Sequence, residues 1–288
     1  MKKRSFKALL KQYARTPGSL LVCLLVFLAA LISVGCVVAL IGYILVKGVP
    51  NLSLELFAWE YTSENVSLMP ALVNTVTMTL LSLLLAVPLG LGAAVFLTEY
   101  AKRGTKFVKL VRATAETLSG IPSIIYGLFG LLLFVTTLGW GYSLLAGACT
   151  LAIMILPLIL RTSEEALKAV PDSYREGSYG LGAGRLRTIF KVVVPDAVPG
   201  IVGGVILAVG RIVGETAALI YTAGTVAQVP GNLLASGRTL AVHMYALSSE
   251  GIYIEQSYAT AVVLLVLVVG INALSAAVAK KLAKGKQG

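Results

Sequence analysis

Residues 20–46 read LLVCLLVFLAALISVGCVVALIGYILV, an apolar run without a single charged side chain. As a helix rising 1.5 Å per residue, this run would be roughly 40 Å long, whereas the hydrocarbon core of a bilayer is about 30 Å thick. The run therefore predicts a helix that crosses a membrane. Because the apolar region of a secretory signal is only about 7 to 15 residues long, we interpret this segment as a retained anchor.

The composition of the whole chain agrees with this interpretation. Of its 288 residues 57% are hydrophobic and 13% charged, and the mean hydropathy is +0.89; soluble domains are about 45 to 50% apolar and about 25% charged. The predicted fold class is an all-α polytopic membrane protein with six transmembrane helices and no sizeable soluble domain. The six predicted spans are residues 20–46, 69–97, 121–138, 144–160, 198–221 and 258–279.

The positive charges predict an orientation. All 24 lysines and arginines except Lys47, Arg211 and Arg238 lie in the N-terminal tail, in the C-terminal tail, or in the links after the second and fourth spans. Under the positive-inside rule this bias places both termini in the cytoplasm. It also accounts for the net charge of +11 without a nucleic-acid partner. We divide the chain into residues 1–68, with the tail, first span and outer loop, and a core of residues 69–288.

The inner loop of residues 161–196 is long enough to have structure of its own. Ser173 and Glu176 have the spacing of a capping box, which predicts a helix start. Gly180, Gly182 and Gly184 then predict a turn, and a basic amphipathic stretch follows. Local physics leaves open whether this helix, turn and helix form a solvated connector or a docking element.

Part of this loop resembles a known motif. Glu176-Gly177-Ser178, three residues, Gly182, nine residues and Val192-Val193-Val194-Pro195 are similar to the EAA motif of bacterial ABC importer permeases, with small or aliphatic replacements. The resemblance implies a cytoplasmic coupling helix that inserts into a cleft of a separate ATPase subunit, which would hold ATP and magnesium. The chain has no phosphate-cradling G-x-x-x-x-G-K-[ST] sequence of its own. The candidate coupling residues are Arg175, Glu176, Gly177, Ser178, Gly182 and Pro195.

Two ionisable residues, Arg211 and Glu215, lie within the fifth predicted span, where a charge is costly unless it faces protein or water. At positions i and i+4 of one helix they would share a face. One interpretation is a mutually neutralising structural pair. The other is an anion relay, in which Arg211 binds a tetrahedral oxyanion and Glu215 masks its charge when no substrate is present.

The segment RIVGETA at residues 211–217 narrows the resemblance. It is similar to the R-x-x-G-E-T-A segment of phosphate-specific ABC importer permeases of the PstA type, as are residues 74–75, 86–90, 97–100 and 119–130. The resemblance implies a bacterial cytoplasmic-membrane subunit that forms a pore with a sister permease, above two ATPase subunits. An extracytoplasmic phosphate-binding protein would deliver the substrate. The candidate translocation residues are Arg211, Glu215, Thr216, Asn74, Ser119 and Ser123.

Ser119 and Ser123 flank Pro122, and their hydroxyls either line the pore or satisfy backbone groups that the proline leaves unpaired. No catalytic residue, metal site or bound cofactor is predicted, because Glu215 is the only carboxylate deep in a span and the cysteines have no metal-ligand spacing. Two alternative functions remain: a permease for another oxyanion such as molybdate or sulfate, and an ion-coupled secondary carrier.

Overall fold

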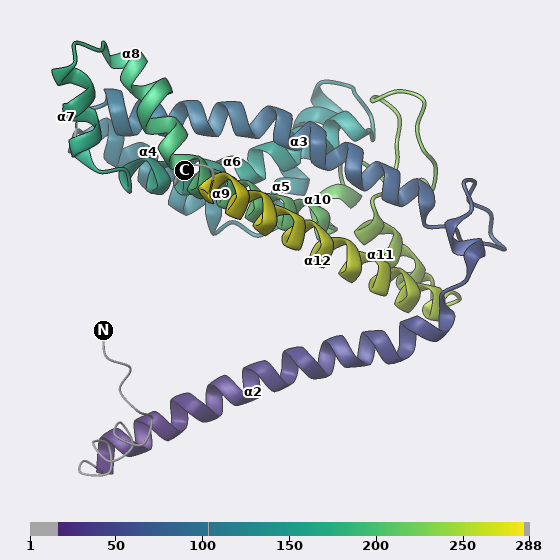
Figure 1. Ribbon diagram of the computed structural model, residues 1–288. Helices are drawn as coiled ribbons and strands as arrows, with labels where there is room; N and C mark the ends of the chain where they lie inside the picture. The colour runs from purple at the N-terminus through teal and green to yellow at the C-terminus, as the bar shows by residue number, and fades with distance from the viewer. Residues whose placement is uncertain (1–16, 103, 285–288) are drawn as a thin grey trace.

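The computed structural model describes residues 17–102 and 104–284, and these form helices and connecting loops without a β-strand (Figure 1). Five helices, counting the continuous helical stretch of residues 185–213 as one, are long and apolar enough to cross a membrane, and a bent pair makes up to six. The predicted all-α, multi-pass class is therefore confirmed. The long helices are α2 (Pro17–Gly48), α3 (Met69–Val95), α6 (Leu144–Lys168), α9 (Val194–Val213) and α12 (Ile254–Lys284).

Shorter elements connect the long helices and extend them. The short α-helices are α4 (Lys106–Ser119), α5 (Ser123–Gly130), α7 (Asp172–Gly180), α8 (Arg185–Thr188), α10 (Ala217–Ile220) and α11 (Leu240–Glu250). The single 3-10 turns are η1 (Val49–Asn51) and η2 (Leu54–Phe57), and the π-helical turns are η3 (Phe96–Tyr100), η4 (Leu131–Thr137) and η5 (Ile189–Val193).

The third apolar run is one half of a bent pair and not a straight crossing. Helices α4 and α5 meet at an angle of 100°. Pro122 cannot donate a backbone hydrogen bond, so the chain turns there. Polar side chains take up the backbone carbonyls before the bend: Ser119 Oγ donates to Ala115 O at 2.9 Å, and Tyr126 Oη donates to Leu118 O at 2.8 Å.

Helix α6 is the centre of the bundle, and 67% of the residues in its apolar 18-residue stretch are buried. It packs against α3, α4, α5 and α9, and its side chains Leu151, Met154 and Ile155 are almost completely buried in the largest apolar cluster. The approach of α3 is close because of Gly90: a Cβ atom there would lie 2.7 Å from Cγ2 of Ile159.

Helix α2 stands apart from this bundle (Figure 1). None of the residues in its apolar 18-residue stretch is buried, and it meets α12 only near its C-terminal end. There the hydroxyls of Tyr43 and Tyr258 lie 3.2 Å apart, and Gly48 packs against the Tyr258 carbonyl. An apolar helix of this length needs a hydrocarbon environment or another apolar surface around it.

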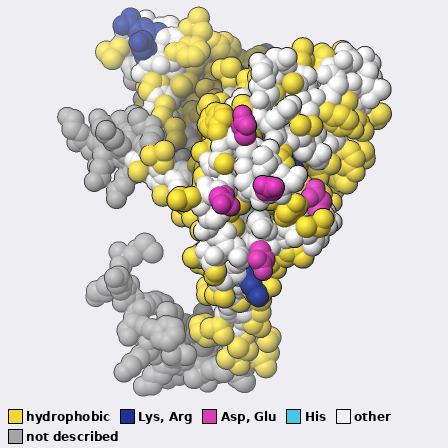
Figure 2. Space-filling model, turned by 90° about the vertical axis from the view of Figure 1, so that its right-hand side faces the viewer, with side chains coloured by type: hydrophobic (Ala, Val, Ile, Leu, Met, Phe, Trp, Pro, Cys, Tyr) yellow, Lys and Arg dark blue, Asp and Glu magenta, His cyan; other side chains and the backbone are white. Residues whose placement is uncertain are grey.

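The two ends of the bundle differ in charge. We call the end that carries α7 and α8 the coupling end, and the end that carries η2 and α11 the outer end. Figure 2 shows the outer end, where acidic side chains stand among apolar and neutral ones. The acidic residues of its elements are Glu55, Glu60, Glu64, Glu250 and Glu255. At the coupling end basic residues outnumber acidic ones. The basic residues of its elements are Lys106, Lys109, Arg112, Arg161, Lys168, Arg175, Arg185, Arg187 and Lys191, and the acidic ones are Glu99, Glu116, Glu164, Glu165, Asp172 and Glu176.

The contact between α3 and α6 predicts a difference between two neighbouring glycines. Gly90→Val places a branched side chain against Ile159, and overpacking of this kind costs about 1 to 3 kcal/mol. The Cβ atom of Gly92→Val, two residues further along the same helix, meets no atom within 4 Å. We expect thermal melting of the detergent-purified protein to shift down by several degrees for Gly90→Val only. Equal shifts for both variants would contradict this packing.

Candidate functional site

The fifth predicted span is interrupted. Helix α9 ends at Val213, Gly214 follows as its cap, and the short helix α10 begins only at Ala217. The Glu215 amide still donates to Ile212 O at 3.1 Å, so part of the backbone at the break remains paired. On one side of the break α10 packs against α5, with Ala218 beside Gly127, whereas Gly214 itself is exposed. Broken helices at membrane depth are typical of substrate sites in transporters.

This break corrects the prediction that Arg211 and Glu215 share a helix face. Arg211 belongs to the last turn of α9, whereas Glu215 lies beyond the helix end. Glu215 is 8% exposed, and its Oε1 accepts a hydrogen bond from the Ala218 amide at 3.1 Å. Within residues 17–102 and 104–284 no ion pair joins the two side chains. The mutual pair fails because Gly214 ends the helix between them.

Arg211 is consequently a half-buried cation without a carboxylate partner among the described residues. Its position in the last turn of α9 is favourable, since the carbonyl end of a helix attracts positive charge. Its charge also acts on the hydroxyl group of Tyr126, which lies on α5. The five donors of the guanidinium remain available to an oxyanion.

The other predicted translocation residues lie in three places. Thr216 follows Glu215 and lines a groove of about 380 Å³ together with Ile44 of α2 and residues of α11 and α12. Ser119 and Ser123 bracket the bend between α4 and α5, and the Ser119 hydroxyl satisfies a backbone carbonyl. Asn74 lies near the start of α3 and binds the outer loop, with Nδ2 donating to Gln228 O at 2.8 Å. The structure therefore brings together Arg211, Glu215 and Thr216.

A buried polar cluster at the outer end was not predicted. Arg238 is 5% exposed, its Cζ lies 4.8 Å from the centre of the Tyr61 ring, and its Nε and Nη2 atoms have no hydrogen-bond partner. His243 is fully buried and meets the same tyrosine edge to face. Burial, reinforced by the charge of Arg238, lowers the pKa of His243 to about 3. In the sequence, the signal for this cluster was Arg238 itself, an isolated cation on a side with few positive charges.

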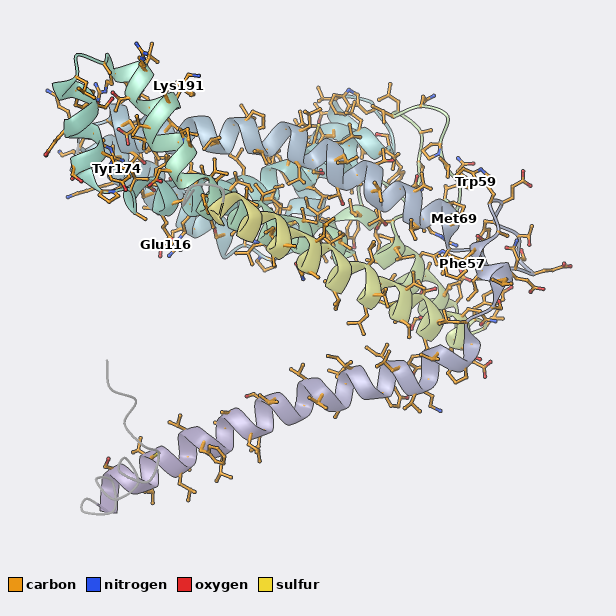
Figure 3. The ribbon with its side chains drawn as sticks, viewed as in Figure 1. Phe57, Trp59, Met69, Glu116, Tyr174 and Lys191 are labelled. Atoms are coloured by element: carbon orange, nitrogen blue, oxygen red, sulfur yellow. The ribbon has the colours of Figure 1, made fainter. Side chains whose placement is uncertain are left out.

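The inner loop forms the predicted helix, glycine turn and helix. Gly182 has a φ of +80°, a conformation that suits glycine, and it turns the chain between α7 and α8. Leu181 at the tip is 91% exposed. The predicted capping box does not form: α7 begins at Asp172 after Pro171, and its start has no side-chain cap. Figure 3 shows Tyr174 of α7 and Lys191 of η5 at this end of the molecule.

The predicted coupling residues divide into an exposed and an internal set. Glu176 and Gly177 are exposed on α7. Arg175 points inward, where its side chain is 14% exposed and bound to Glu99. Ser178 Oγ lies 2.8 Å from Thr188 Oγ1, which joins α7 to α8, and Pro195 lies in the first turn of α9. Only the exposed set can touch a docked subunit.

The chain matches a known protein family over most of its length. Residues 86–284 match the family described as "binding-protein-dependent transport system inner membrane component". The chain belongs to this family. It is therefore a multi-pass membrane subunit of the ABC importer permease type, and a transport component.

Similar proteins include several permeases of the PstA type, so the predicted resemblance to this type is confirmed. The probable ABC transporter permease protein YqgI of Bacillus subtilis is 36% identical over 239 residues, 78% of this chain and 81% of that protein. The phosphate transport system permease protein PstA of Mycobacterium leprae is 34% identical over 212 residues, 72% of this chain and 68% of that protein. PstA 1 of Mycobacterium tuberculosis is 43% identical over 155 residues, which cover 54% and 50% of the two chains.

Solved structures with the same fold come from other ABC transporters. A chain of the bacterial alginate ABC transporter in complex with a pentasaccharide-bound periplasmic protein superposes with a TM-score of 0.65 at 18% identity, over 94% of this chain and 98% of that chain. A chain of the MetNI methionine transporter in an inward-facing conformation gives 0.58 at 21% identity, over 75% and 94%. At these identities the likeness extends to the fold alone.

The buried imidazole predicts a dependence of stability on pH. The pKa of His243 is about 3 in the folded chain against 6.5 for a free side chain, so the unfolded state binds the proton more readily. Stability is therefore lost as the pH falls from 6.5 towards 3, by about 2 kcal/mol at pH 5. We expect His243→Gln to reduce the fall in melting temperature between pH 7.5 and pH 5. An identical fall in both proteins would contradict this prediction.

Proposed function

We propose that this chain is the transmembrane permease subunit of an ATP-driven importer of inorganic phosphate. The observation that carries the proposal is the half-buried Arg211 at a broken helix, without a carboxylate partner among the described residues, in a chain with PstA-type relatives. A related sister permease completes the pore. Two ATPase subunits, which hold ATP and magnesium, dock at the coupling end, and an extracytoplasmic phosphate-binding protein delivers the anion to the outer end.

The proposed chemistry at the break uses the shape and charge of Arg211. A guanidinium presents parallel donors that match two oxygens of a phosphate ion, and the surrounding low-dielectric bundle strengthens this attraction. Glu215 lies across the break with its carboxylate on the Ala218 amide. We propose that phosphate and Glu215 are alternative partners of Arg211 in successive states. The anion then leaves when the carboxylate takes its place.

The proposed drive comes from the coupling end. Leu181 and Glu176 are exposed around the Gly182 turn, so this tip can enter a cleft of the ATPase. The concentration of basic residues at the same end supports a cytoplasmic position for it. Closure of the ATPase pair around ATP would then move α7 and switch the pore between outward and inward access.

Two other functions compete with this one. One arginine does not distinguish tetrahedral anions, so molybdate or sulfate is the alternative substrate. A secondary carrier would use Arg211 and Glu215 with an ion gradient and would work without an ATPase. Uptake that uncouplers abolish and that persists without the ATPase subunit would favour the carrier.

Arg211→Gln is the direct test of the substrate site. In cells lacking the native gene, we expect this variant to lower labelled phosphate uptake at least about 100-fold, because the bound phosphate would lose its charged partner, and truncating one partner of a buried charge pair costs about 2 to 5 kcal/mol. Arg161→Gln is the matched control, since Arg161 is exposed and pairs only with Glu165 one turn away. Excess sulfate or molybdate should not compete. Wild-type uptake by Arg211→Gln would remove Arg211 from the path.

Glu176→Lys tests docking of the ATPase. Its reversed charge on the exposed face of α7 should lower recovery of the ATPase in detergent pull-downs at least about 10-fold, a loss of 1.4 kcal/mol. Glu116→Lys is the control, because Glu116 is exposed on α4, apart from the coupling loop, by which we mean α7, α8 and the turn between them (Figure 3). Equal recovery with both variants would place the ATPase contact elsewhere.

A further inference from the structure

We infer that Glu99 is the positioning residue that ties the coupling loop to α3, and that α3 transmits the movement of α7 to the outer loop. Glu99 lies in η3, the π-helical turn that continues α3, and it is 8% exposed. The inference rests on the proposed function in one respect: an ATPase must move α7. It adds the route by which that movement crosses the membrane.

The first tie runs from α7 to Glu99. Arg175 Nη2 lies 2.7 Å from Glu99 Oε1, and Arg175 Nε donates to the same oxygen at 3.1 Å. The rest of the guanidinium donates to Leu167 O at 3.0 Å and Val170 O at 2.8 Å at the end of α6. This fork therefore holds α7, η3 and the end of α6 in one arrangement.

The second tie comes from the other side of the glycine turn. Arg185 of α8 donates through Nη2 to the backbone carbonyl of Glu99. Its guanidinium also lies over the Tyr100 ring, with Cζ 4.6 Å from the ring centre. Both helices thus bind Glu99, and α8 also contacts Tyr100, the next residue of η3.

The side chains of α7 are held by polar contacts, namely those of Arg175 with Glu99 and of Ser178 with Thr188. None of its residues is buried. A polar cavity of about 780 Å³ lies between α7, η3 and the end of α6, and Glu99, Arg175 and Arg185 line it. The apolar packing lies on either side of α7 and α8, with Val170 before them and Ile189 and Val193 after them in the cluster around α3 and α6. From α7 itself, Arg175 reaches η3 directly, so a displacement of α7 acts on Glu99 through this ion pair.

The opposite end of the same helix holds the outer loop. Asn74 Nδ2 donates to Gln228 O at 2.8 Å and to Arg238 O at 3.1 Å, and the Leu240 amide donates to Thr75 Oγ1 at 2.8 Å. Helix α3 with η3 forms one stretch of 32 residues, about 48 Å long at 1.5 Å per residue. It is bonded by side chains at both ends, so a shift of η3 reaches residues 228–240 without passing through the lipid-facing α2.

The first experiment measures coupling in the complete complex reconstituted in proteoliposomes. We expect Glu99→Gln to assemble and hydrolyse ATP, but to import at least about 5-fold less phosphate per ATP, the lower end of typical coupling between sites. Glu164→Gln is the matched control: Glu164 is also a buried carboxylate at this end with two basic partners, Arg112 and Lys168, but it ties α6 to α4 and to its own helix. An unchanged ratio for Glu99→Gln, or an equal loss for Glu164→Gln, would overturn the inference.

The second experiment needs no substrate. Amide hydrogen exchange is measured on the same complexes in nanodiscs, before and after trapping with ATP and vanadate. In the wild type we expect exchange in residues 228–240 to change on trapping, and in Glu99→Gln this change should vanish while protection of α7 remains. An outer loop that does not respond in the wild type, or responds equally in the variant, would overturn the inference.

The two experiments separate this inference from the proposed substrate. Transmission to residues 228–240 in a wild-type complex that imports no phosphate would refute the substrate and support the route. If Glu99→Gln yields no assembled complex, Arg185→Gln tests the second tie from an exposed position. That variant should lower the phosphate imported per ATP in the same direction, and an unchanged ratio would count against the route.

Discussion

Hydrocarbon offers no partner to a backbone amide or carbonyl, and the rest of this structure depends on that constraint. Every long element is a helix, because only a helix pairs its backbone groups within one segment. Hydroxyl side chains along α3 bond back to the preceding turn, as Thr75, Thr79 and Ser82 do. Where a helix breaks, nearby groups share the pairing: Ser119 and Tyr126 at the bend after α4, and Glu215 at the gap after α9. At the two breaks the buried residues Tyr126 and Glu215 take part in this pairing, whereas Pro122 and Gly214 themselves are exposed.

Two kinds of interaction hold the molecule together: apolar packing within the bundle and polar contacts at the coupling end. Within the bundle, α6 is surrounded by tightly packed apolar side chains, and glycines such as Gly90 allow its neighbours to approach. At the coupling end, α7 has no buried residue and is held by charges and hydrogen bonds. Apolar packing resists small displacements, whereas a forked ion pair can rotate as a unit. The bundle is therefore held by apolar packing, and the coupling end by polar contacts.

Sequence patterns predicted the fold class and most of the spans, because runs of about 20 apolar residues identify membrane helices without knowledge of their neighbours. The third predicted span is half of a bent pair, and the fifth is interrupted. The same patterns missed the gap between Arg211 and Glu215. Their spacing fits a continuous helix, but Gly214 caps α9 between them and α10 packs separately against Gly127. Asn74 was assigned to the substrate path from its resemblance, but its partners lie more than 150 residues further along the chain. Arg238, His243 and Tyr61 come together only in the folded chain, so the isolated cation Arg238 marked the place in the sequence but did not identify its neighbours.

The isolation of α2 bears on how such chains are assembled and diversified. It joins the bundle only around Tyr43 and Gly48, so the packing of α3 to α12 does not depend on the identity of most of its side chains. A helix of this kind can enter the bilayer as an independent unit, before the segments that follow it have been synthesised. Because most of its side chains touch no other described helix, apolarity is the property that the bilayer requires of them. The match to the family begins at residue 86, so it lies in the helices that follow α2.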